Sequence, residues 1–388
     1  MNLSRRNLLS AAPLFIPRSA WGANDRLTYA TIAVGGRGRY VGRTFQKLGA
    51  QCAAVCDVYE PNIALALKDT PNAKTYGDYR RLLEDKSIDA VVIASPDHHH
   101  CPMLLAALSA GKDVYLEKPL SHSLAESDRM IRAVRQTDRI VQVGMQRRSA
   151  ESILKAKKIV DDGVLGRISH VRPQWHWNVS RPLDNSPLPG NLDWKSFLGS
   201  APDRPLEPMR FRRWRYFYDY AGGNMTDQGT HLMDVVQWFT KSGPPKSAIA
   251  HGYVANMKGA EHPDVFTAVF EYPEFMVTWT LNYNNSHQNG WSITFQGDKA
   301  TMILDEAGFQ VLAEPWKRDA APILEEKSPV PVESHIENFI SCIKSRQQPT
   351  CTVEVAAQAV AGPHLANIAM LQHRRVRLGP DLVSTMSD

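Results

Sequence analysis

The feature that most constrains this fold is a regular alternation of short apolar runs and helical stretches between residues 27 and 147. The run TYATIAV leads into a glycine turn, a helical stretch VGRTFQKLGA and a second apolar run, CAAVCDV. Three later runs, DAVVIASP, DVYLEKP and RIVQVGMQ, are separated by helical patterns in the same way. Short links of this kind allow little besides a parallel sheet covered on both faces. We therefore predict a doubly wound α/β domain over residues 27–147.

The pattern changes after residue 150, where longer runs rich in β-branched and aromatic residues take over. In VTWTLNY, the apolar side chains of Val277, Trp279 and Leu281 alternate with polar ones. Such alternation predicts a mostly antiparallel sheet with one face packed on helices and the other face open. We predict an α+β substrate-binding domain over residues 148–388, with C-terminal helices returning toward the first domain. Its open face is expected to support a homo-oligomer, a dimer or a tetramer, although a solvated face is the alternative.

The first 22 residues have the features of a twin-arginine export signal. A pair of arginines precedes a short apolar run from Leu8 to Ile16, and small residues follow at cleavage-like spacing. An apolar surface helix is the alternative, but Pro13 and Pro17 would interrupt it. The run is too short to cross a bilayer. We therefore expect a mature protein without a membrane span, located in the periplasm or cell envelope.

The charge of the chain does not favour a nucleic-acid partner. The 388 residues have a formal net charge of +5, and three of the arginines responsible lie in the first 22 residues. The rest of the chain is therefore close to neutral, whereas nucleic-acid-binding domains are strongly basic.

The glycine turn IAVGGRGRYVG has the form of a dinucleotide-binding loop. Ala33, Gly35 and Gly38 take the three glycine positions of that fingerprint, with alanine in the first. Gly35 lets the backbone approach a pyrophosphate, and the start of the next helix offers free amides. Asp57 ends the second apolar run about 20 residues later, where a carboxylate accepts hydrogen bonds from a ribose and repels a 2′-phosphate. This pattern favours NAD over NADP.

Two further segments end strands at the sheet edge where ligands bind in this class of fold. SPDHHH, residues 95–100, follows DAVVIA, and EKP follows DVYL. Consecutive histidines diverge and have no carboxylate placed to complete a metal site, so we predict no metal and expect nucleotide contact or helix capping instead. The predicted cofactor-binding residues are Ala33, Gly35, Gly36, Arg37, Gly38, Asp57, Ser95, Pro96, His100, Glu117, Lys118 and Gln146.

The segment MTDQGTHLMD, residues 225–234, sets acids around a histidine. On a helix, Asp227, His231 and Asp234 share one stripe, beside an apolar stripe that anchors the helix. Thr226 fits an N-terminal cap. One interpretation is a buried histidine with an acidic neighbour, and the other is an imidazole that an acid orients for proton transfer.

Together, the motifs AVGGRG, CDV, SPDHHH, EKP, VGMQRR, GGNMTDQGTHLMD and HIENF resemble the Gfo/Idh/MocA oxidoreductase family over nearly the whole chain from residue 27. The resemblance implies a Rossmann domain, an open-faced α/β domain and oligomers built on its sheet. It also implies hydride transfer between a sugar or cyclitol carbinol and a nicotinamide. Lys118, Asp227 and His231 match the catalytic positions, and Asp234 matches a substrate-contact position.

Aromatic and basic residues in QWHW, at 174–177, and RFRRWRYFYDY, at 210–220, offer flat apolar faces and donors suited to a pyranose. Base stacking of a nucleic acid is the least favoured interpretation. The predicted substrate-binding residues are Lys118, Arg147, Trp175, Trp214, Tyr216, Asp227, His231 and Asp234.

The function predicted from the sequence is an NAD-dependent oxidoreductase for a carbohydrate hydroxyl. Either His231, oriented by Asp227, or Lys118 removes the hydroxyl proton, and the lysine charge stabilises the oxygen. Because the twin-arginine route carries folded proteins, we expect NAD to be loaded before export and held tightly. Two alternatives stay open: a redox-neutral NAD-dependent glycoside hydrolase or lyase acting by transient oxidation and elimination, and a non-enzymatic sensor of NAD or sugar.

Overall fold

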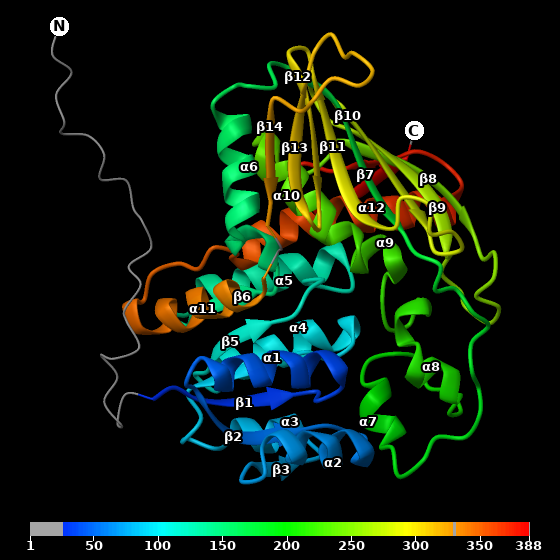
Figure 1. Cartoon of the computed structure of the whole chain (residues 1–388). Coiled ribbons are helices and arrows are strands. Elements are labelled where there is room, and N and C mark those ends of the chain that lie inside the picture. The colour runs from blue at the N-terminus through cyan, green and yellow to red at the C-terminus, as the bar shows by residue number, and fades with distance from the viewer. Residues whose placement is uncertain (1–25, 329–330, 388) are drawn as a thin grey trace, which may run out of the picture.

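The computed structural model describes residues 26–328 and 331–387, which form two domains around two sheets (Figure 1). The predicted export signal at residues 1–22 lies outside the described residues. Within the part of the chain that is described, no helix has the length and apolar character needed to cross a bilayer.

The N-terminal domain is an open parallel sheet with the strand order β3-β2-β1-β4-β5-β6, the order of dinucleotide-binding doubly wound domains. Every strand pair in it is parallel, so the predicted Rossmann fold is confirmed. The strands are β1 (Thr28–Ile32), β2 (Gln51–Cys56), β3 (Lys74–Tyr76), β4 (Ala90–Ile93), β5 (Asp113–Leu116) and β6 (Val141–Val143). The helices are α1 (Gly36–Lys47), α2 (Glu60–Asp69), α3 (Tyr79–Leu83), α4 (His100–Ser109) and α5 (Leu124–Arg135).

The second domain is built on a ten-stranded sheet with the order β14-β13-β12-β11-β7-β10-β9-β8-β15-β16. Only the β7–β10 pair is parallel among its described pairs, so the predicted mostly antiparallel sheet is confirmed. The strands are β7 (Ile168–His176), β8 (Ser247–Tyr253), β9 (Val265–Glu271), β10 (Met276–Asn282), β11 (Gly290–Gly297), β12 (Ala300–Asp305), β13 (Gly308–Ala313), β14 (Leu324–Lys327), β15 (Val376–Leu378) and β16 (Thr385–Ser387).

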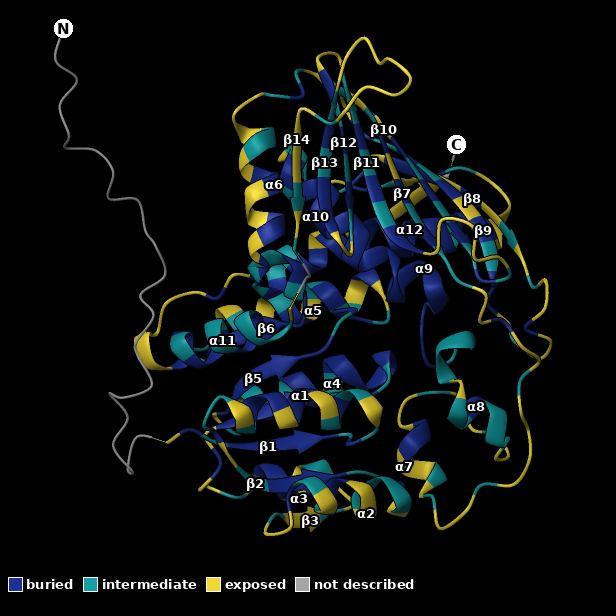
Figure 2. Cartoon of the chain, viewed as in Figure 1, coloured by how far each residue is buried: buried dark blue, intermediate teal, exposed yellow. Residues whose placement is uncertain are grey.

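One face of this sheet is the core of the domain, as the alternation in VTWTLNY predicts. Val277, Trp279 and Leu281 are fully buried, whereas Met276 at the start of the same strand is half exposed. Figure 2 shows buried residues concentrated where the sheet meets α10 and α12. The α-helices that follow β6 in the chain are α6 (Glu151–Asp161), α7 (Trp194–Leu198), α8 (Pro208–Arg212), α9 (Gly223–Asp227), α10 (Gly229–Thr240), α11 (Glu333–Ser345) and α12 (Val353–Gln372).

The two C-terminal helices join the domains. The first half of α12 packs Ala356 and Val360 into the Rossmann core, and its second half packs Leu365 and Ala369 into the core of the ten-stranded sheet. Phe339 of α11 lies edge-on to Tyr115 of β5, with 5.7 Å between the ring centroids. These contacts hold α9 and α10 at the carboxyl edge of the parallel sheet (Figure 1).

Candidate active site

The glycine turn lies between β1 and α1, where a dinucleotide loop belongs. Gly35 precedes the first residue of α1, and a Cβ on Gly38 would stand 2.0 Å from the carbonyl oxygen of Ala33. Only glycine fits at Gly38, because a side chain there would push the helix off the turn. Ala33 adopts a φ of +65°, a left-handed conformation that costs an L-residue about 1–2 kcal/mol. The turn therefore keeps the close backbone packing of the fingerprint even with alanine in the first position.

A cavity of about 710 Å³ extends from this turn along the carboxyl edge of the parallel sheet. Five of the predicted cofactor residues line it: Ala33, Gly35, Asp57, Ser95 and Pro96. Residues of the segment 195–214 complete the lining, so the second half of the chain contributes to the same cavity. Its volume is in the range of small-molecule and cofactor sites, and its residues fit NAD.

Asp57 stands at the end of β2 inside the cavity, as predicted. Its carboxylate accepts hydrogen bonds from the backbone N–H of Tyr59 at 2.9 Å and from Asn62 Nδ2 at 3.2 Å. Burial raises the pKa of Asp57 to about 6, and these hydrogen bonds oppose the rise. The side chain is therefore mostly ionised at neutral pH and able to accept further hydrogen bonds from ribose hydroxyls.

Other predicted cofactor residues lie outside the lining of this cavity and contact protein groups. Glu117, nearly buried, forms an ion pair with Arg37 at 2.8 Å. The ring nitrogens of His100 lie 2.7 Å and 3.0 Å from the carbonyl oxygens of Pro119 and Ser95. The remaining predicted residues outside the lining are Gly36, Gly38, Lys118 and Gln146.

The histidine run does not form a metal centre. His98 and His99 both direct Nε2 at the carbonyl oxygen of Phe197, at 3.0 Å and 2.8 Å, while His100 turns away toward Pro119. In the described ranges, no group of three His, Cys, Asp or Glu side chains is arranged to hold a metal ion.

The chemical centre lies at the end of β5, where the two domains meet. Lys118 Nζ donates to Asp227 Oδ1 at 2.6 Å and to the Asp227 carbonyl oxygen at 2.9 Å. Arg215 Nε donates to the same carboxylate oxygen at 3.3 Å. Burial disfavours the charged carboxylate, but Lys118 and Arg215 outweigh it and lower the pKa of Asp227 to about 2. A lysine from the nucleotide-binding half and an acid from the other half therefore converge.

His231 is not oriented by Asp227, and this part of the sequence interpretation is wrong. A break at Gln228 puts Asp227 at the end of α9 and His231 in α10. The carboxylate bonds to Lys118 and Arg215 instead, because a charged donor binds a carboxylate more strongly than a neutral imidazole does. Burial, together with the nearby charges of Arg147 and Lys118, holds the pKa of His231 well below its usual range. The imidazole is therefore neutral.

Two other expectations for this segment concern Asp234 and Thr226. Asp234, predicted to contact substrate, accepts a hydrogen bond from Arg148 Nε at 2.8 Å, and its side chain is only 2% exposed. In this structure Asp234 therefore positions Arg148, and its predicted contact with substrate stays a prediction. Thr226 is not a helix cap, because α9 begins before it and its hydroxyl donates back to the carbonyl oxygen of Gly223 at 3.3 Å.

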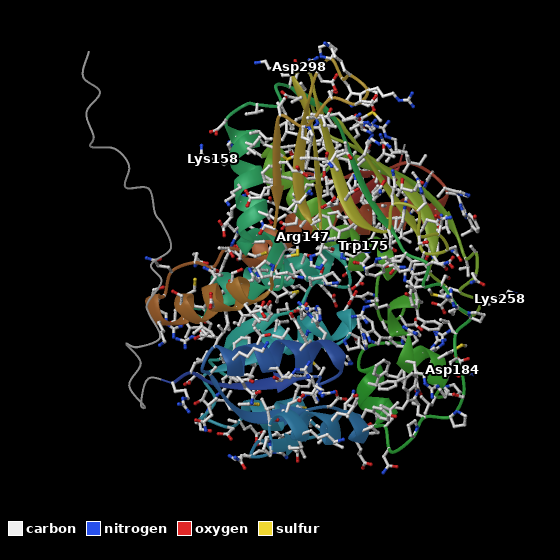
Figure 3. All side chains as sticks on the ribbon, viewed as in Figure 1. Arg147, Lys158, Trp175, Asp184, Lys258 and Asp298 are labelled. Atoms are coloured by element: carbon white, nitrogen blue, oxygen red, sulfur yellow. The ribbon has the colours of Figure 1, made fainter. Side chains whose placement is uncertain are left out.

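The predicted substrate-contact aromatics lie near this centre. Trp214 lines the cavity and stacks under Arg215, with 4.1 Å between Cζ and the ring centroid. Burial and then the charge of Asp227 raise the pKa of Tyr216. Figure 3 shows Arg147 and Trp175 close together between the sheet and the Rossmann domain.

Sequence reasoning missed two members of the site, Arg215 and Asp97. Arg215 belongs to a run with four arginines, and nothing in their spacing selects it. Asp97 lies in SPDHHH, where the histidines drew attention away from the acid. Burial and the neighbouring charge of Asp227 raise the pKa of Asp97 to about 8.

Two family models match the chain. One is described as an oxidoreductase family with an NAD-binding Rossmann fold and covers residues 27–145, and the other is the GFO/IDH/MocA C-terminal domain, covering residues 153–303. The chain belongs to the Gfo/Idh/MocA family. Its N-terminal domain is therefore an NAD-binding Rossmann domain.

The alignments of this Gfo/Idh/MocA protein with two curated relatives cover less than half of each relative's length. Inositol 2-dehydrogenase of Salmonella paratyphi B is 36% identical over 134 residues, which are 34% of this chain and 40% of that protein. Levoglucosan dehydrogenase of Pseudarthrobacter phenanthrenivorans is 30% identical over 162 residues, which are 42% of this chain and 35% of that protein. The alignments thus span at most 40% of the length of these two relatives.

Solved structures extend the likeness to both domains. The WlbA dehydrogenase from Bordetella pertussis, in complex with NADH and UDP-GlcNAcA, matches with a TM-score of 0.71 at 21% identity, covering 91% of this chain and 99% of that one. Levoglucosan dehydrogenase, in complex with NADH and levoglucosan, matches with a TM-score of 0.73 at 18% identity, with the same coverage. At these identities the likeness establishes the common fold.

Proposed function

We propose that this protein is an NAD-dependent oxidoreductase that transfers a hydride between a hydroxyl-bearing carbon of a sugar or cyclitol and the nicotinamide. The observation that carries the proposal is the 2.6 Å contact between Lys118 and Asp227 at the carboxyl edge of the sheet that also bears the nucleotide cavity. The names of two relatives, which give inositol and levoglucosan as substrates, support the same class of alcohol.

The cavity residues suit NAD better than NADP. The turn at 33–38 would hold the pyrophosphate and Asp57 the adenosine ribose. A carboxylate at that position repels a 2′-phosphate, and no arginine follows it in DVYEPN. The chemistry that the nicotinamide supplies there is acceptance of a hydride from the carbinol carbon.

Lys118 is placed to bind the alcohol oxygen. An ammonium group has three donors, and two of them are used by the carboxylate and the carbonyl oxygen of Asp227. The third is available for the substrate oxygen, whose negative charge grows as the carbon–hydrogen bond breaks. Asp227 fixes the direction of the ammonium group through these two hydrogen bonds.

His231 is the better candidate for the base. The Asp227 carboxylate is engaged by Lys118 and Arg215, so it is not free to take a hydroxyl proton. The neutral imidazole of His231 makes no hydrogen bond with the described residues, and its Nδ1 is buried without a partner. One of its ring nitrogens therefore remains an acceptor for the alcohol proton.

The test is to purify the mature protein without added nucleotide, identify any nucleotide released on denaturation, and follow nicotinamide absorbance with a panel of sugars and cyclitols. We expect NAD and turnover of at least one carbohydrate. His231→Ala should lower turnover by about 10²- to 10⁴-fold with unchanged NAD binding. Equal losses of both would remove His231 from this role, and glycoside cleavage without added NAD would favour the hydrolase or lyase alternative.

We further propose that the protein is an exported homo-oligomer. Exposed apolar side chains on the open face of the ten-stranded sheet support the oligomer: Ile249, Tyr253 and Met276 are each at least 50% exposed. Light scattering should give a mass above that of one chain, and Met276→Glu should lower it. The arginine pair at residues 5–6 supports export, which cell fractionation with Arg5→Lys and Arg6→Lys substitutions checks.

A further inference from the structure

Arg147 is a buried cation that forms no ion pair with the described residues. It is 5% exposed, and within the described residues its guanidinium has no ion pair or hydrogen bond, with Nη1 fully buried. Burial lowers the pKa of Arg147 to about 9, so the group is still charged at neutral pH. An unpartnered buried donor opposes folding, and a charged one more so. A contribution to folding stability therefore does not explain why an arginine is buried at position 147.

Two tryptophans define which part of the guanidinium is free. Arg147 Cζ lies 3.9 Å from the ring centroid of Trp291 and 5.4 Å from that of Trp175. Indole rings stack on the flat face of a guanidinium, so its in-plane N–H groups can still donate hydrogen bonds to another partner. The indole N–H of Trp175 is also buried without a hydrogen bond. Unused donors of Arg147 and Trp175 thus lie close together.

Two of the neighbouring carboxylates are engaged by other cations, and a third, Glu306, acts on Arg147 through its charge without forming an ion pair with it. Asp234 pairs with Arg148 at 2.8 Å. Asp227 serves both Lys118 and Arg215, so two cations share one anion there. The charges around the site therefore sum to a positive value, and Arg147 is the cation that no protein anion contacts.

We propose that the substrate carries a carboxylate and that Arg147 binds it, so that the protein acts on an acidic sugar such as a hexuronic acid and not on its neutral counterpart. The inference rests on the proposed function and names the substrate class. In-plane N–H pairs of a guanidinium match the two oxygens of a carboxylate. Trp175 and Trp291 would hold the guanidinium plane in place and pack on the sugar ring.

The experiment compares matched ligands on the NAD-loaded protein: glucuronate with its methyl ester and with glucose, and galacturonate with galactose. We expect kcat/KM for the acid to exceed that for the ester by about 10- to 100-fold, as for a charge-assisted hydrogen-bonded pair. Arg147→Met should bring that ratio to within about threefold, and Arg147→Lys should retain part of it because a single ammonium lacks the planar pair of donors. Arg132→Met, on an α5 side chain that is 70% exposed, is the matched control and should leave the ratio unchanged.

Calorimetric binding of the same ligands separates this inference from the proposed function. Turnover of neutral sugars with no preference for acids would overturn the inference and leave the function standing. A preference for acids that survives Arg147→Met would also overturn it. If no ligand is turned over, binding of the acid that depends on Arg147 still supports the carboxylate site, and absence of such binding rejects it. The ester comparison in the unsubstituted protein decides the matter even if Arg147→Met does not fold.

Discussion

Replacing Asp227 by Asn tests the buried charge cluster most directly. The substitution keeps the size of the side chain and one acceptor oxygen, but it removes the negative charge that Lys118 and Arg215 contact at 2.6 Å and 3.3 Å. Two cations would then face one another in a buried site with no anion between them. Both the stability of the protein and its turnover should fall.

The size of the stability change follows from the pKa of Asp227. Lys118 and Arg215 lower it, against the effect of burial, from 3.8 to about 2, and a difference of this size corresponds to about 2–3 kcal/mol. Because the pKa is lower in the folded state, this stabilisation is present above about pH 4 and is lost as the pH falls toward 2. Asp227→Asn should therefore cost about 2–3 kcal/mol at pH 7 and much less near pH 2.

Urea unfolding followed by tryptophan fluorescence measures the change at both pH values. The control is Asp162→Asn, which breaks an ion pair whose lysine, Lys158, is 74% exposed, and which should cost less than about 0.5 kcal/mol. A double-mutant cycle with Lys118→Met should give a coupling of about 1–3 kcal/mol. If Asp227→Asn costs no more than the control, or costs the same at every pH, the ion-pair reasoning is refuted.

The remaining predictions concern single residues. Gly38→Ala should weaken NAD binding at least tenfold in calorimetry, because the new Cβ would stand 2.0 Å from the Ala33 carbonyl oxygen; unchanged affinity would disprove the close packing. NAD affinity should fall by about tenfold per pH unit below pH 6, where Asp57 takes up a proton, and Asp57→Asn should abolish that dependence. Asp97 is protonated more readily in the folded state, with a pKa raised from 3.8 to about 8, so urea midpoints should fall as the pH rises from about 4 to about 8, and Asp97→Asn should remove the fall. Lys118→Met should lower kcat by about 10²- to 10⁴-fold with NAD affinity retained; a parallel loss of affinity would place the lysine in cofactor binding.

The nucleotide-binding end was predictable because its geometry is local. A strand, a turn and a helix start determine what a residue at Gly38 must be, since the helix packs on the turn only five residues earlier. Asp57 follows from the same reasoning, because the end of β2 is adjacent to the end of β1 in the sheet. Patterns of a few residues carry such information, and the prediction of a parallel sheet followed from them.

The chemical centre was predictable in its members but not in its contacts. The sequence pattern groups Asp227, His231 and Asp234 in one segment, and the structure places this segment, divided at Gln228, at the junction of the domains. Spacing does not identify partners from distant segments. Two such partners, Lys118 and Arg148, form ion pairs with the carboxylates of Asp227 and Asp234. Ion pairs between residues about 100 positions apart in the sequence determine how these side chains are arranged. Periodicity in the sequence does not predict such pairs.

These ion pairs also explain why acids flank the histidine. Lys118 follows β5 and Arg148 follows β6, so both cations stand at the carboxyl edge of the parallel sheet. Their partners, Asp227 and Asp234, lie on either side of His231 in the chain, and each pair is closed at less than 3 Å. Buried ion pairs add little net stability but fix relative position. The two acids therefore attach α9 and α10 to the nucleotide-binding edge at two points, and His231, between these attachments in the chain, is held in a position that fits its proposed role as the base.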